Sequence, residues 1–403
     1  EGVTGKQYGG TNPSDSSGTL QYVRVWHGGA KIATDNEING ITFGGVGSGT
    51  VVDHCEVAYN ADDGFEFFGG TVNVKYLSVL FGGDDSFDTD QGYQGKGQFL
   101  FTMLGSQGDH GTEMDSQQGA DHDAQPRSHP QFYSMTIVGG GATGRGGELM
   151  HLNDGTGGRF ANLVLVNPTD DGIVYDDCGT QLQITQTSQS CTSNCLYVSP
   201  KNIIAGVPAG SQAIKAKSSC SAPGAASSTA SLSSDPKLAG GDFSEFSKVP
   251  VDPRPSCNGP AYSDLEPPAN LPSGIEETAF KGAFGQSNWL DGWSIMNTPL
   301  HPGFVSSALD CPVEGHSPPL SLCGDITSDT TWYFGPIYVL TCQVFVKAGA
   351  TLSIQAGVTV YATQTDADGN APAIIVEKGG MILADGTADA PITFTALDSA
   401  ATS

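Results

Sequence analysis

Basic residues are scarce in this chain of 403 residues, which has 17 Lys and Arg against 43 Asp and Glu and a formal net charge of -26. A nucleic-acid backbone binds to a stripe of positive side chains, and the sequence has no such stripe. Nucleic acid is therefore excluded as a partner. The acidity instead favours divalent cations or polycationic partners, or a solvated surface that only keeps the protein soluble.

Long apolar runs and N-glycosylation sequons are also missing. No run of 18 apolar residues occurs, so no membrane span is predicted. Without an Asn-x-Ser/Thr sequon, any glycosylation of this chain would have to be O-linked, most plausibly in the Ser-rich stretch 218–234. The sequence also lacks G-x-S-x-G, P-loop and H-E-x-x-H motifs, and so it carries none of these catalytic signatures.

The nine cysteines are unevenly spread, with Cys55 alone in an apolar run and the other eight after residue 177. An even number of cysteines in loop-rich sequence is typical of disulfides in an oxidising compartment, so we expect an extracellular or cell-surface protein. A zinc site at Cys191 and Cys195 is the alternative, but no second pair has matching spacing. The disulfide candidates are Cys178, Cys191, Cys195, Cys220, Cys257, Cys311, Cys323 and Cys342.

Two interleaved series of short apolar segments repeat along the first part of the chain. One series includes GTVVDHCEVAY from Gly49 and GTVNVKYLSVL from Gly70, and the other includes DGFEFFGG from Asp63. The segments alternate in polarity and are bounded by Gly, Asp or Asn, which is typical of strands and corners. Their spacing of roughly 21 to 25 residues suits a solenoid coil, whereas a propeller blade needs about 40 residues. The sequence therefore predicts an all-β fold, a right-handed parallel β-helix with coils over residues 1–179.

The pattern breaks after residue 179. Residues 180–310 are rich in Ser, Pro and Cys, and they predict an irregular, disulfide-rich cap and loop region ending near the NWLDGW segment at 288–293. Alternating apolar residues return in 311–403, for example in VFVKAGATLSIQAGVTVYA from Val344. This last part predicts the start of a second β-helical unit.

Several segments resemble a family of secreted, repeat-containing β-helical surface proteins of bacteria and some microalgae. NGITFGGVGSGTVVDHCEVAY from Asn39 and GDDSFDTDQGYQGK from Gly83 carry the resemblance. NWLDGW is similar to the end of that domain, and GDITSDTTWYF from Gly324 is similar to its beginning. The family has no common catalytic set, so the resemblance implies a fold and a surface location but no activity.

The resemblance also implies an unusual order, because the end-like part precedes the beginning-like part. Either the chain spans the junction of tandem domains, or its C-terminal coils stack on the open N-terminal coil of a neighbouring copy. Such a contact is heterologous and does not close, so it would grow a fibre. We therefore expect an extracellular structural protein, a building block of a surface filament, appendage, wall or matrix whose partners are copies of itself.

Acidic corners are the first candidate site. Asp residues recur beside glycines at equivalent positions of the repeats, and stacked coils would align their carboxylates. Closely spaced carboxylates and turn carbonyls are typical of Ca²⁺ sites, so Ca²⁺ is the expected cofactor if there is one. The alternative is that Asp only caps tight turns through its side chain. The candidate ligands are Asp62, Asp63, Asp84, Asp85, Asp88 and Asp90.

The second candidate is the polar stretch 108–129, which combines His with carboxylates. Such a set could bind a transition metal or supply acid–base catalysis. A β-helical polysaccharide lyase or hydrolase is therefore one alternative function, and a calcium-dependent carbohydrate-binding or adhesive module is another. The Arg-x-Lys pair expected of pectin-hydrolysing β-helices is absent, which favours a polar surface loop. The candidates here are Asp109, His110, Asp115 and His122.

Other polar and aromatic residues favour packing roles. His27, His54 and His151 lie in strand-like runs, and we interpret them as stacked polar side chains rather than ligands. Trp289 and Trp293 could form a sugar platform, although their spacing favours packing at the end of the domain.

Overall fold

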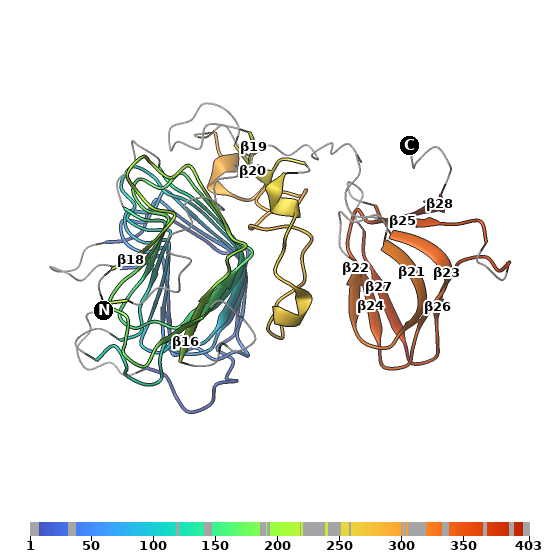
Figure 1. The fold of residues 1–403 in the computed structure, drawn as a ribbon, viewed down its shortest axis with the longest axis horizontal. Helices are drawn as coiled ribbons and strands as arrows, with labels where there is room; N and C mark the ends of the chain where they lie inside the picture. The colour runs from blue at the N-terminus through green and yellow to red at the C-terminus, as the bar shows by residue number, and fades with distance from the viewer. Residues whose placement is uncertain are drawn as a thin grey trace. The chain divides into compact units, whose positions relative to one another are not determined.

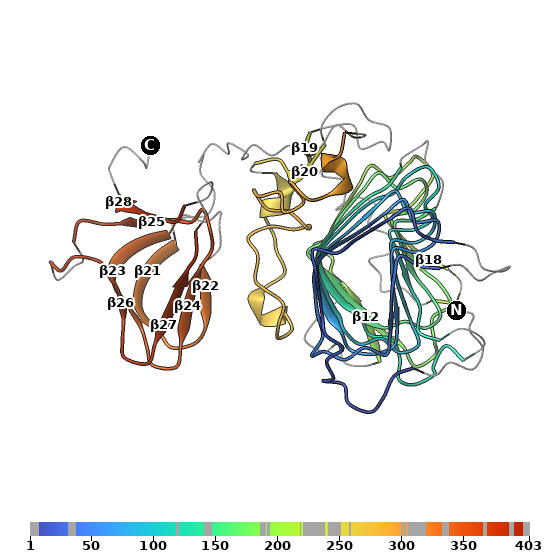
Figure 2. The same cartoon turned by 180° about the vertical axis from the view of Figure 1, so that it is seen from behind.

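The computed structural model is built almost entirely of β-strands and divides the chain into two compact units, Glu1–Leu309 and Asp310–Ser403. Figures 1 and 2 show the ribbon from opposite sides. The structure describes residues 8–30, 38–117, 121–140, 147–185, 191, 194–217, 219–220, 238–240, 251–257, 259–299, 301, 304, 320–332, 338–365, 369–386 and 391–397.

A seven-stranded parallel sheet forms one wall of the first unit. Each strand pairs in register with the equivalent strand of the next coil, as Phe65 does with Phe87. Because side chains alternate along a strand, every second residue faces the interior and those between face outward. In sheet order the strands are β18 (Ile214–Ala216), β14 (Ile173–Tyr175), β11 (Met150–Leu152), β9 (Thr112–Met114), β7 (Phe87–Asp90), β5 (Phe65–Phe68) and β3 (Ile41–Gly44).

An eleven-stranded parallel sheet forms the other walls, and Figure 1 shows the coils superposed around a common interior. Its main order is β1–β4–β6–β8–β10–β12–β16–β15, with β2, β13 and β17 beside it. The strands are β1 (Thr19–Gln21), β2 (Arg24–Trp26), β4 (Val51–Ala58), β6 (Asn73–Leu80), β8 (Lys96–Met103), β10 (Gln131–Val138), β12 (Gly158–Ala161), β13 (Val164–Val166), β15 (Gln183–Thr185), β16 (Cys195–Val198) and β17 (Ile203–Ala205).

The eight-residue strands of this sheet bend at one residue with left-handed backbone dihedrals. The φ angles are 49° at His54, 54° at Tyr76, 60° at Phe99 and 53° at Ser134. The bend carries a strand from one wall to the next, so β10 pairs with β12 at its start and with β13 at its end. This conformation is unfavourable for bulky residues. Ring stacking offsets it, with centroids 4.4 Å apart for His54 and Tyr76 and 4.8 Å apart for Tyr76 and Phe99.

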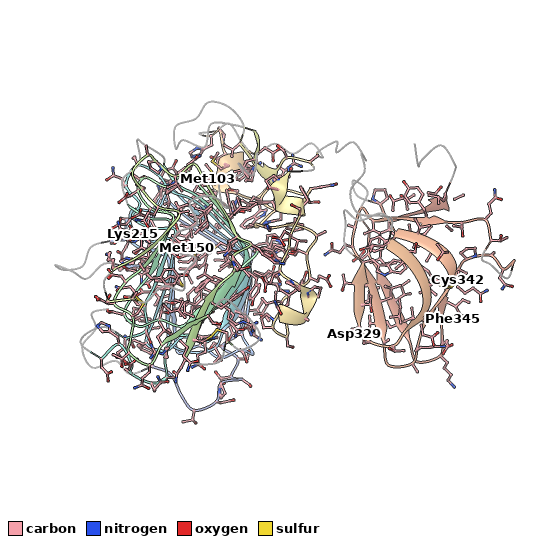
Figure 3. The ribbon with its side chains drawn as sticks, in the orientation of Figure 1. Met103, Met150, Lys215, Asp329, Cys342 and Phe345 are labelled. Carbon is pink, nitrogen blue, oxygen red and sulfur yellow. A yellow bond between two sulfur atoms is a disulfide. The ribbon has the colours of Figure 1, made fainter. Side chains whose placement is uncertain are left out.

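Apolar side chains fill the interior of the coils in continuous columns. The rings of Phe65 and Phe87 are buried and stack with centroids 5.8 Å apart. Figure 3 labels Met150, which lies in this interior, and Lys215, which lies on the outer surface of the same sheet. No single coil could bury such a column, so the stacking of coils stabilises the fold.

The coils continue beyond residue 179, where the repeat pattern predicted their end. Strands β16, β17 and β18 extend both sheets in parallel, with Phe160 paired to Val198 and Tyr175 paired to Ala216. The predicted boundary was wrong because these strands are only three or four residues long and lie between polar, cysteine-bearing connections. Short strands of this kind leave little periodicity to detect.

A segment between Val251 and Phe304 covers the outer face of the eleven-stranded sheet. Apolar residues of the segment, including Phe284, pack against outward-facing residues of the sheet such as Leu80. Trp289 and Trp293 pack edge-on against His54, in agreement with the packing role that their spacing favours. The segment contains β20 (Asp252–Pro255), which pairs antiparallel with β19 (Leu238–Gly240), and the 3-10 helices η4 (Pro260–Tyr262), η5 (Pro268–Asn270) and η6 (Ile295–Asn297).

The second unit is a shorter parallel β-helix, so the predicted fold class is confirmed. One sheet contains β21 (Leu320–Ile326), β23 (Tyr338–Val346), β25 (Thr359–Ala362), β28 (Thr393–Ala396) and β26 (Ile374–Val376). The other contains β22 (Thr330–Trp332), β24 (Thr351–Ile354) and β27 (Met381–Ala384). All pairings within these two sheets are parallel.

The predicted disulfides are present where the structure describes both cysteines. Cys257 is also disulfide-bonded, Cys311 lies outside the described residues, and Cys55 is free and buried in the core. The bond between Cys191 and Cys195 also removes both thiolates from the alternative zinc site. The disulfides within the described part of the chain are Cys178–Cys220, Cys191–Cys195 and Cys323–Cys342.

Candidate functional site: an acidic face on the seven-stranded sheet

The outer surface of the seven-stranded sheet carries a row of acidic and imidazole side chains. Glu66, Asp88, Glu113 and His151 lie on successive strands, and each pairs directly with the next. Neighbouring strands lie about 4.8 Å apart, so these outward-facing groups are within reach of one another. We call this row the acidic ladder.

A second row lies at the corner two residues before each strand, and we call it the corner row. A Cβ on Gly64 would lie 2.6 Å from the carbonyl oxygen of Ser86, so only glycine lets adjacent coils approach this closely. The backbone N–H of Gly64 donates to the carbonyl oxygen of Asp85 at 2.8 Å, which holds the corners in line. The polar members of the corner row are Asp63, Asp85, His110, Glu148 and Asp171.

Side-chain hydrogen bonds connect the corner row from coil to coil. Asp63 Oδ1 accepts from the backbone N–H of Asp85 at 3.1 Å. Asp85 Oδ1 accepts from the backbone N–H of His110 at 2.7 Å and lies 2.9 Å from His110 Nδ1. These carboxylates therefore join neighbouring coils, and the alternative that Asp caps its own tight turn stays a prediction.

Burial and crowding raise the pKa of several carboxyl groups on this face. Burial, together with the charges of Asp85 and Asp109, raises the pKa of Asp84 to about 6. Burial, together with the charges of Asp85 and Asp115, raises the pKa of Glu113 to about 9. Glu113 therefore holds a proton at neutral pH, and a bound cation could take its place. The pKa is raised in the same way at Asp63, Asp88 and Asp115.

The pKa values of the two histidines on this face shift in opposite directions. Burial alone lowers the pKa of His110, but the hydrogen bond to Asp85 and the charges of Asp85 and Asp109 raise it to about 9. Burial and the charge of His110 lower the pKa of His151. Neither ring nitrogen of His151 has a hydrogen-bond partner among the described residues. The ring of His151 lies 5.1 Å from that of His110 and beside Glu113 on the adjacent strand, in agreement with the interpretation of His151 as one of several stacked polar side chains.

Four of the six calcium candidates meet at one edge of the acidic face. Carboxylate oxygens of Asp62, Asp63 and Asp84 lie within 4.8 Å of one another, and so do those of Asp63, Glu66 and Asp88. The sequence interpretation missed Glu66, although it occupies the same place in its repeat as Asp88. Both groups offer the oxygen ligands that Ca²⁺ prefers, and calcium binding stays a prediction.

The remaining calcium candidates are engaged elsewhere. Asp85 contacts His110, as described above, and Asp90 at the end of β7 accepts a hydrogen bond from the backbone N–H of Gln91 at 2.5 Å. Each of them lies outside the two clusters of carboxylates.

The candidates of the stretch 108–129 separate into two places. Asp109 and His110 lie at the corner before β9, and Asp115 follows the same strand, so all three belong to the acidic face. His122 lies instead beside Asp154, with Nδ1 3.1 Å from the carboxylate oxygen Oδ1. Part of the stretch is thus a strand of the sheet rather than an inserted loop.

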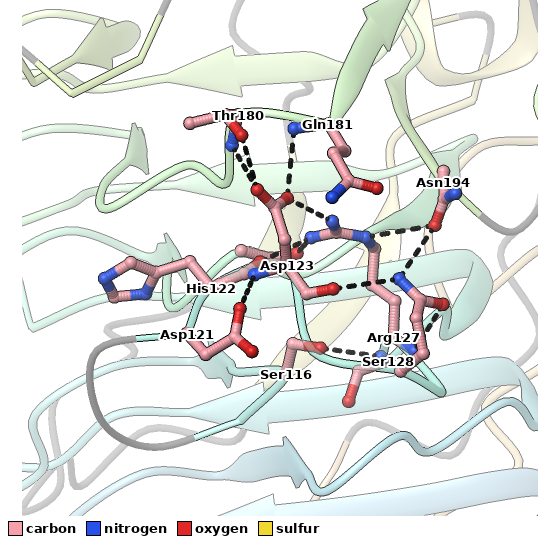
Figure 4. A network of polar contacts seen from close by, with 11 residues as sticks. Ser116, Asp121, His122, Asp123, Arg127, Ser128, Thr180, Gln181 and Asn194 are labelled. Atoms are coloured by element: carbon pink, nitrogen blue, oxygen red, sulfur yellow. Dashed lines mark hydrogen bonds and ion pairs between the residues drawn. The ribbon is translucent and has the colours of Figure 1, made fainter.

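The rest of the stretch is held by a buried arginine (Figure 4). The side chain of Arg127 is fully buried and donates to the carboxylate of Asp123 at 2.7 Å and to the carbonyl oxygen of His122 at 2.8 Å. Asp123 also accepts from the hydroxyl of Thr180 at 2.6 Å. The hydrogen bonds from Thr180, and then those from Gln181 and Arg127, lower the pKa of Asp123 to about 2. Within the described residues this network holds His122 and Asp123 in place through a buried arginine.

Free basic side chains are lacking on the acidic face within the described strands. Strand pairing continues the acidic ladder to Thr42 at one end and to Val174 and Lys215 at the other. Lys215 is the one lysine or arginine at these seven positions, and it donates to Asp171 at 2.6 Å. Lys217, two residues on, is bonded to Asp176. A lyase acting on an acidic polysaccharide would need an available base beside its substrate. Both lysines are engaged in ion pairs, and the imidazole of His151, whose pKa is lowered, is the base that this face offers.

Comparison with known proteins gives a family but no individual relative. The family described as "Pectate-lyase like beta helix domain" matches residues 1–234 and 324–403, which lie in both units. No curated protein and no solved structure matches the chain significantly. Among the residues that the structure describes, no helix has the length and apolar character needed to span a membrane.

Proposed function

Because the chain belongs to the pectate-lyase-like β-helix domain family, we propose that it is an extracellular structural protein, a building block of a surface filament, appendage, wall or matrix. The disulfides support a place outside the cell, since such bonds persist in oxidising surroundings. The proposal depends on one observation, which is that interior-facing apolar side chains of the second unit are exposed among the described residues.

The last coil of the second unit exposes side chains that point into its interior. Ile382 on β27 pairs with the buried Leu352 and so faces the core, yet it is 38% exposed. Phe394 on β28 pairs with the buried Val360 and is 52% exposed. Together with Val376 they line an open pocket of about 670 Å³. An apolar column left open in this way is a surface on which another coil can stack.

The first coil of a second copy is the partner that we propose for this surface. In the first unit, β1 and β3 are the end strands of their sheets, so each has a free edge among the described residues. Because coils add in one direction, the last coil of one unit fits the first coil of another. Such a contact is heterologous and repeats without closing, which makes a filament.

Sedimentation velocity and negative-stain electron microscopy of the purified chain test this proposal. We expect oligomers that lengthen with concentration into filaments with an axial repeat of one chain. The exposed apolar side chains could also be covered from within one polypeptide, and the protein would then stay monomeric. A monomer at every concentration, with and without Ca²⁺ and reductant, would therefore overturn head-to-tail assembly between copies.

A polysaccharide hydrolase is the second candidate function, and Asp84 is the observation that favours it. Its pKa of about 6 lets it keep a proton in mildly acidic solution, where it could act as a general acid. The carboxylate of Asp62 lies in the same cluster and is a candidate partner. Release of reducing ends from a polysaccharide, lost in Asp84→Asn, would support this function. Unchanged release in that variant would contradict the role of Asp84.

A further inference from the structure

Two histidines and two glutamates meet on neighbouring coils of the seven-stranded sheet. The sequence contains them as His110-Gly-Thr-Glu113 and Glu148-Leu-Met-His151, two pairs with the same spacing and opposite order. Glu113 pairs directly with His151 across β9 and β11, and a backbone hydrogen bond between the two corners places His110 beside Glu148. Each imidazole therefore has a carboxylate on its own coil and another on the adjacent coil.

The ligand atoms of His110, Glu113 and His151 lie within 4.8 Å of one another, and Glu148 lies beside the two imidazoles. His110 Nε2 lies 4.0 Å from Glu148 Oε1, and the same oxygen lies 3.9 Å from His151 Nδ1. His151 Nδ1 lies 3.6 Å from Glu113 Oε1. Ligand atoms at about 2.0–2.1 Å from Zn²⁺ in a tetrahedron are about 3.3 Å apart. Small side-chain rotations would bring the ligand atoms of His110, Glu113 and His151 to one ion, and a larger movement of Glu148 would supply the fourth ligand.

The surroundings of His151 point to a ligand that completes them. Its side chain is 13% exposed, and both ring nitrogens are buried without a hydrogen-bond partner among the described residues. A buried polar group without a partner is unfavourable, so folding alone does not explain this placement. A cation bound at Nδ1 would satisfy one nitrogen and would separate the two carboxylates beside it.

A carboxylate lies near the second ring nitrogen of each imidazole, the one that would not bind the ion. Asp85 Oδ1 lies 2.9 Å from His110 Nδ1, which leaves Nε2 directed toward Glu148. Asp176 Oδ2 lies 3.5 Å from His151 Nε2. Metal-binding histidines commonly donate their second N–H to a carboxylate, because the contact fixes the ring and strengthens the ligand. Asp85 is at this distance from His110, and Asp176 would have to move closer to His151 to make the same bond.

We propose that His110, Glu113, Glu148 and His151 bind one Zn²⁺ ion or a divalent ion of similar preference. The two imidazoles select against Ca²⁺, which takes oxygen ligands, and the two carboxylates balance the charge of the ion. Four protein ligands complete a tetrahedron, which is typical of a structural zinc site. The ion would fasten two consecutive coils, and it is independent of the open end of the second unit.

Titration of the metal-free full chain with Zn²⁺ and Co²⁺ tests the proposal. We expect one ion per chain, the intense visible absorption of tetrahedral Co²⁺, and no displacement by excess Ca²⁺. X-ray absorption of the zinc-loaded chain should show four nitrogen or oxygen ligands that include two imidazoles. This measurement needs no variant, so it decides the matter even if substitutions impair folding.

His151→Gln is expected to weaken Zn²⁺ binding more than about 100-fold, because loss of an outer partner alone costs about 10–100-fold. His27→Gln is the matched control, since His27 is exposed and lies outside the acidic face. A thermal melt without metal verifies that each variant is folded. Failure of the native chain to bind Zn²⁺, undiminished binding by His151→Gln, displacement by Ca²⁺, or a zinc spectrum without imidazole would each overturn the proposal.

Discussion

The apolar side chains at the open end of the second unit determine how strongly coils can stack there. Complete burial of a large apolar side chain stabilises by about 1.5–3 kcal/mol. Val376, Ile382 and Phe394 have 39%, 38% and 52% of their surface still exposed. Covering them is therefore worth about 1 kcal/mol each, or roughly 3 kcal/mol together, which is about a 100-fold gain in the association constant.

The double variant Ile382→Ser and Phe394→Ser removes about two thirds of this contribution. We expect the association constant to fall about 30-fold, since roughly 2 kcal/mol is lost. Leu383→Ser is the matched control, because Leu383 lies on the same strand and is 53% exposed, but it points outward beside Ser353. Its association constant should stay within about twofold of the native value, as expected for a side chain outside the interior column.

Sedimentation velocity over a range of concentrations measures the association constant of each variant, and a thermal melt verifies that the second unit is folded. An equal fall in the association constant of Leu383→Ser would show that exposed apolar side chains promote association whether they point into the interior or outward. Filaments that form unchanged in the double variant would refute the reasoning, because the open interior would then play no part in assembly.

Three further predictions concern stability. Asp252→Ala should lower the free energy of unfolding by about 3–5 kcal/mol in urea titrations, because it leaves the buried Arg254 without the carboxylate that it contacts at 2.7 Å. Asp84 has a native pKa of about 6 against an ordinary value of 3.8, so its contribution to stability is complete below about pH 3.8 and is lost as the pH rises through 6. Asp84→Asn should therefore reduce the fall in melting temperature between pH 4 and pH 7. Replacing Cys178 and Cys220 by Ser opens a loop closed over 42 residues and should lower the free energy of unfolding by about 4 kcal/mol.

Each of these predictions has a simple control. Asp264→Ala breaks the contact between the 70% exposed Asp264 and Lys201, so it should change the free energy of unfolding by less than about 1 kcal/mol. Asp109→Asn changes a half-exposed carboxylate on the same face as Asp84. The melting temperature of this variant should fall more between pH 4 and pH 7 than that of Asp84→Asn. Reductant breaks this bond together with the other disulfides and should lower the free energy of unfolding at least as much as the double Cys variant, and no effect in either case would contradict the loop-closure argument.

The acidic face shows where sequence patterns stop being informative. Repeats place Asp63 and Asp85 at equivalent corners, so their alignment could be predicted from spacing alone. Glu148 and His151 follow an insertion after β10 that lengthens the coil, and the repeat period no longer says which earlier residues lie beside them. Only the pairing of β9 with β11 brings this pair onto His110 and Glu113.

The sequence by itself determined the parallel β-helix, because alternating apolar residues such as Phe65 and Phe67, bounded by corner glycines, can be buried only by stacking coil on coil. It also determined that cysteines after residue 177 would pair, since their number and surroundings suit disulfides. Only the tertiary structure decided how far the coils extend and which carboxylates share a cluster. It also decided that the interior-facing side chains of Ile382 and Phe394 are exposed among the described residues. These outcomes depend on contacts between residues far apart in the chain, and the register of each contact is set by packing that no local pattern encodes.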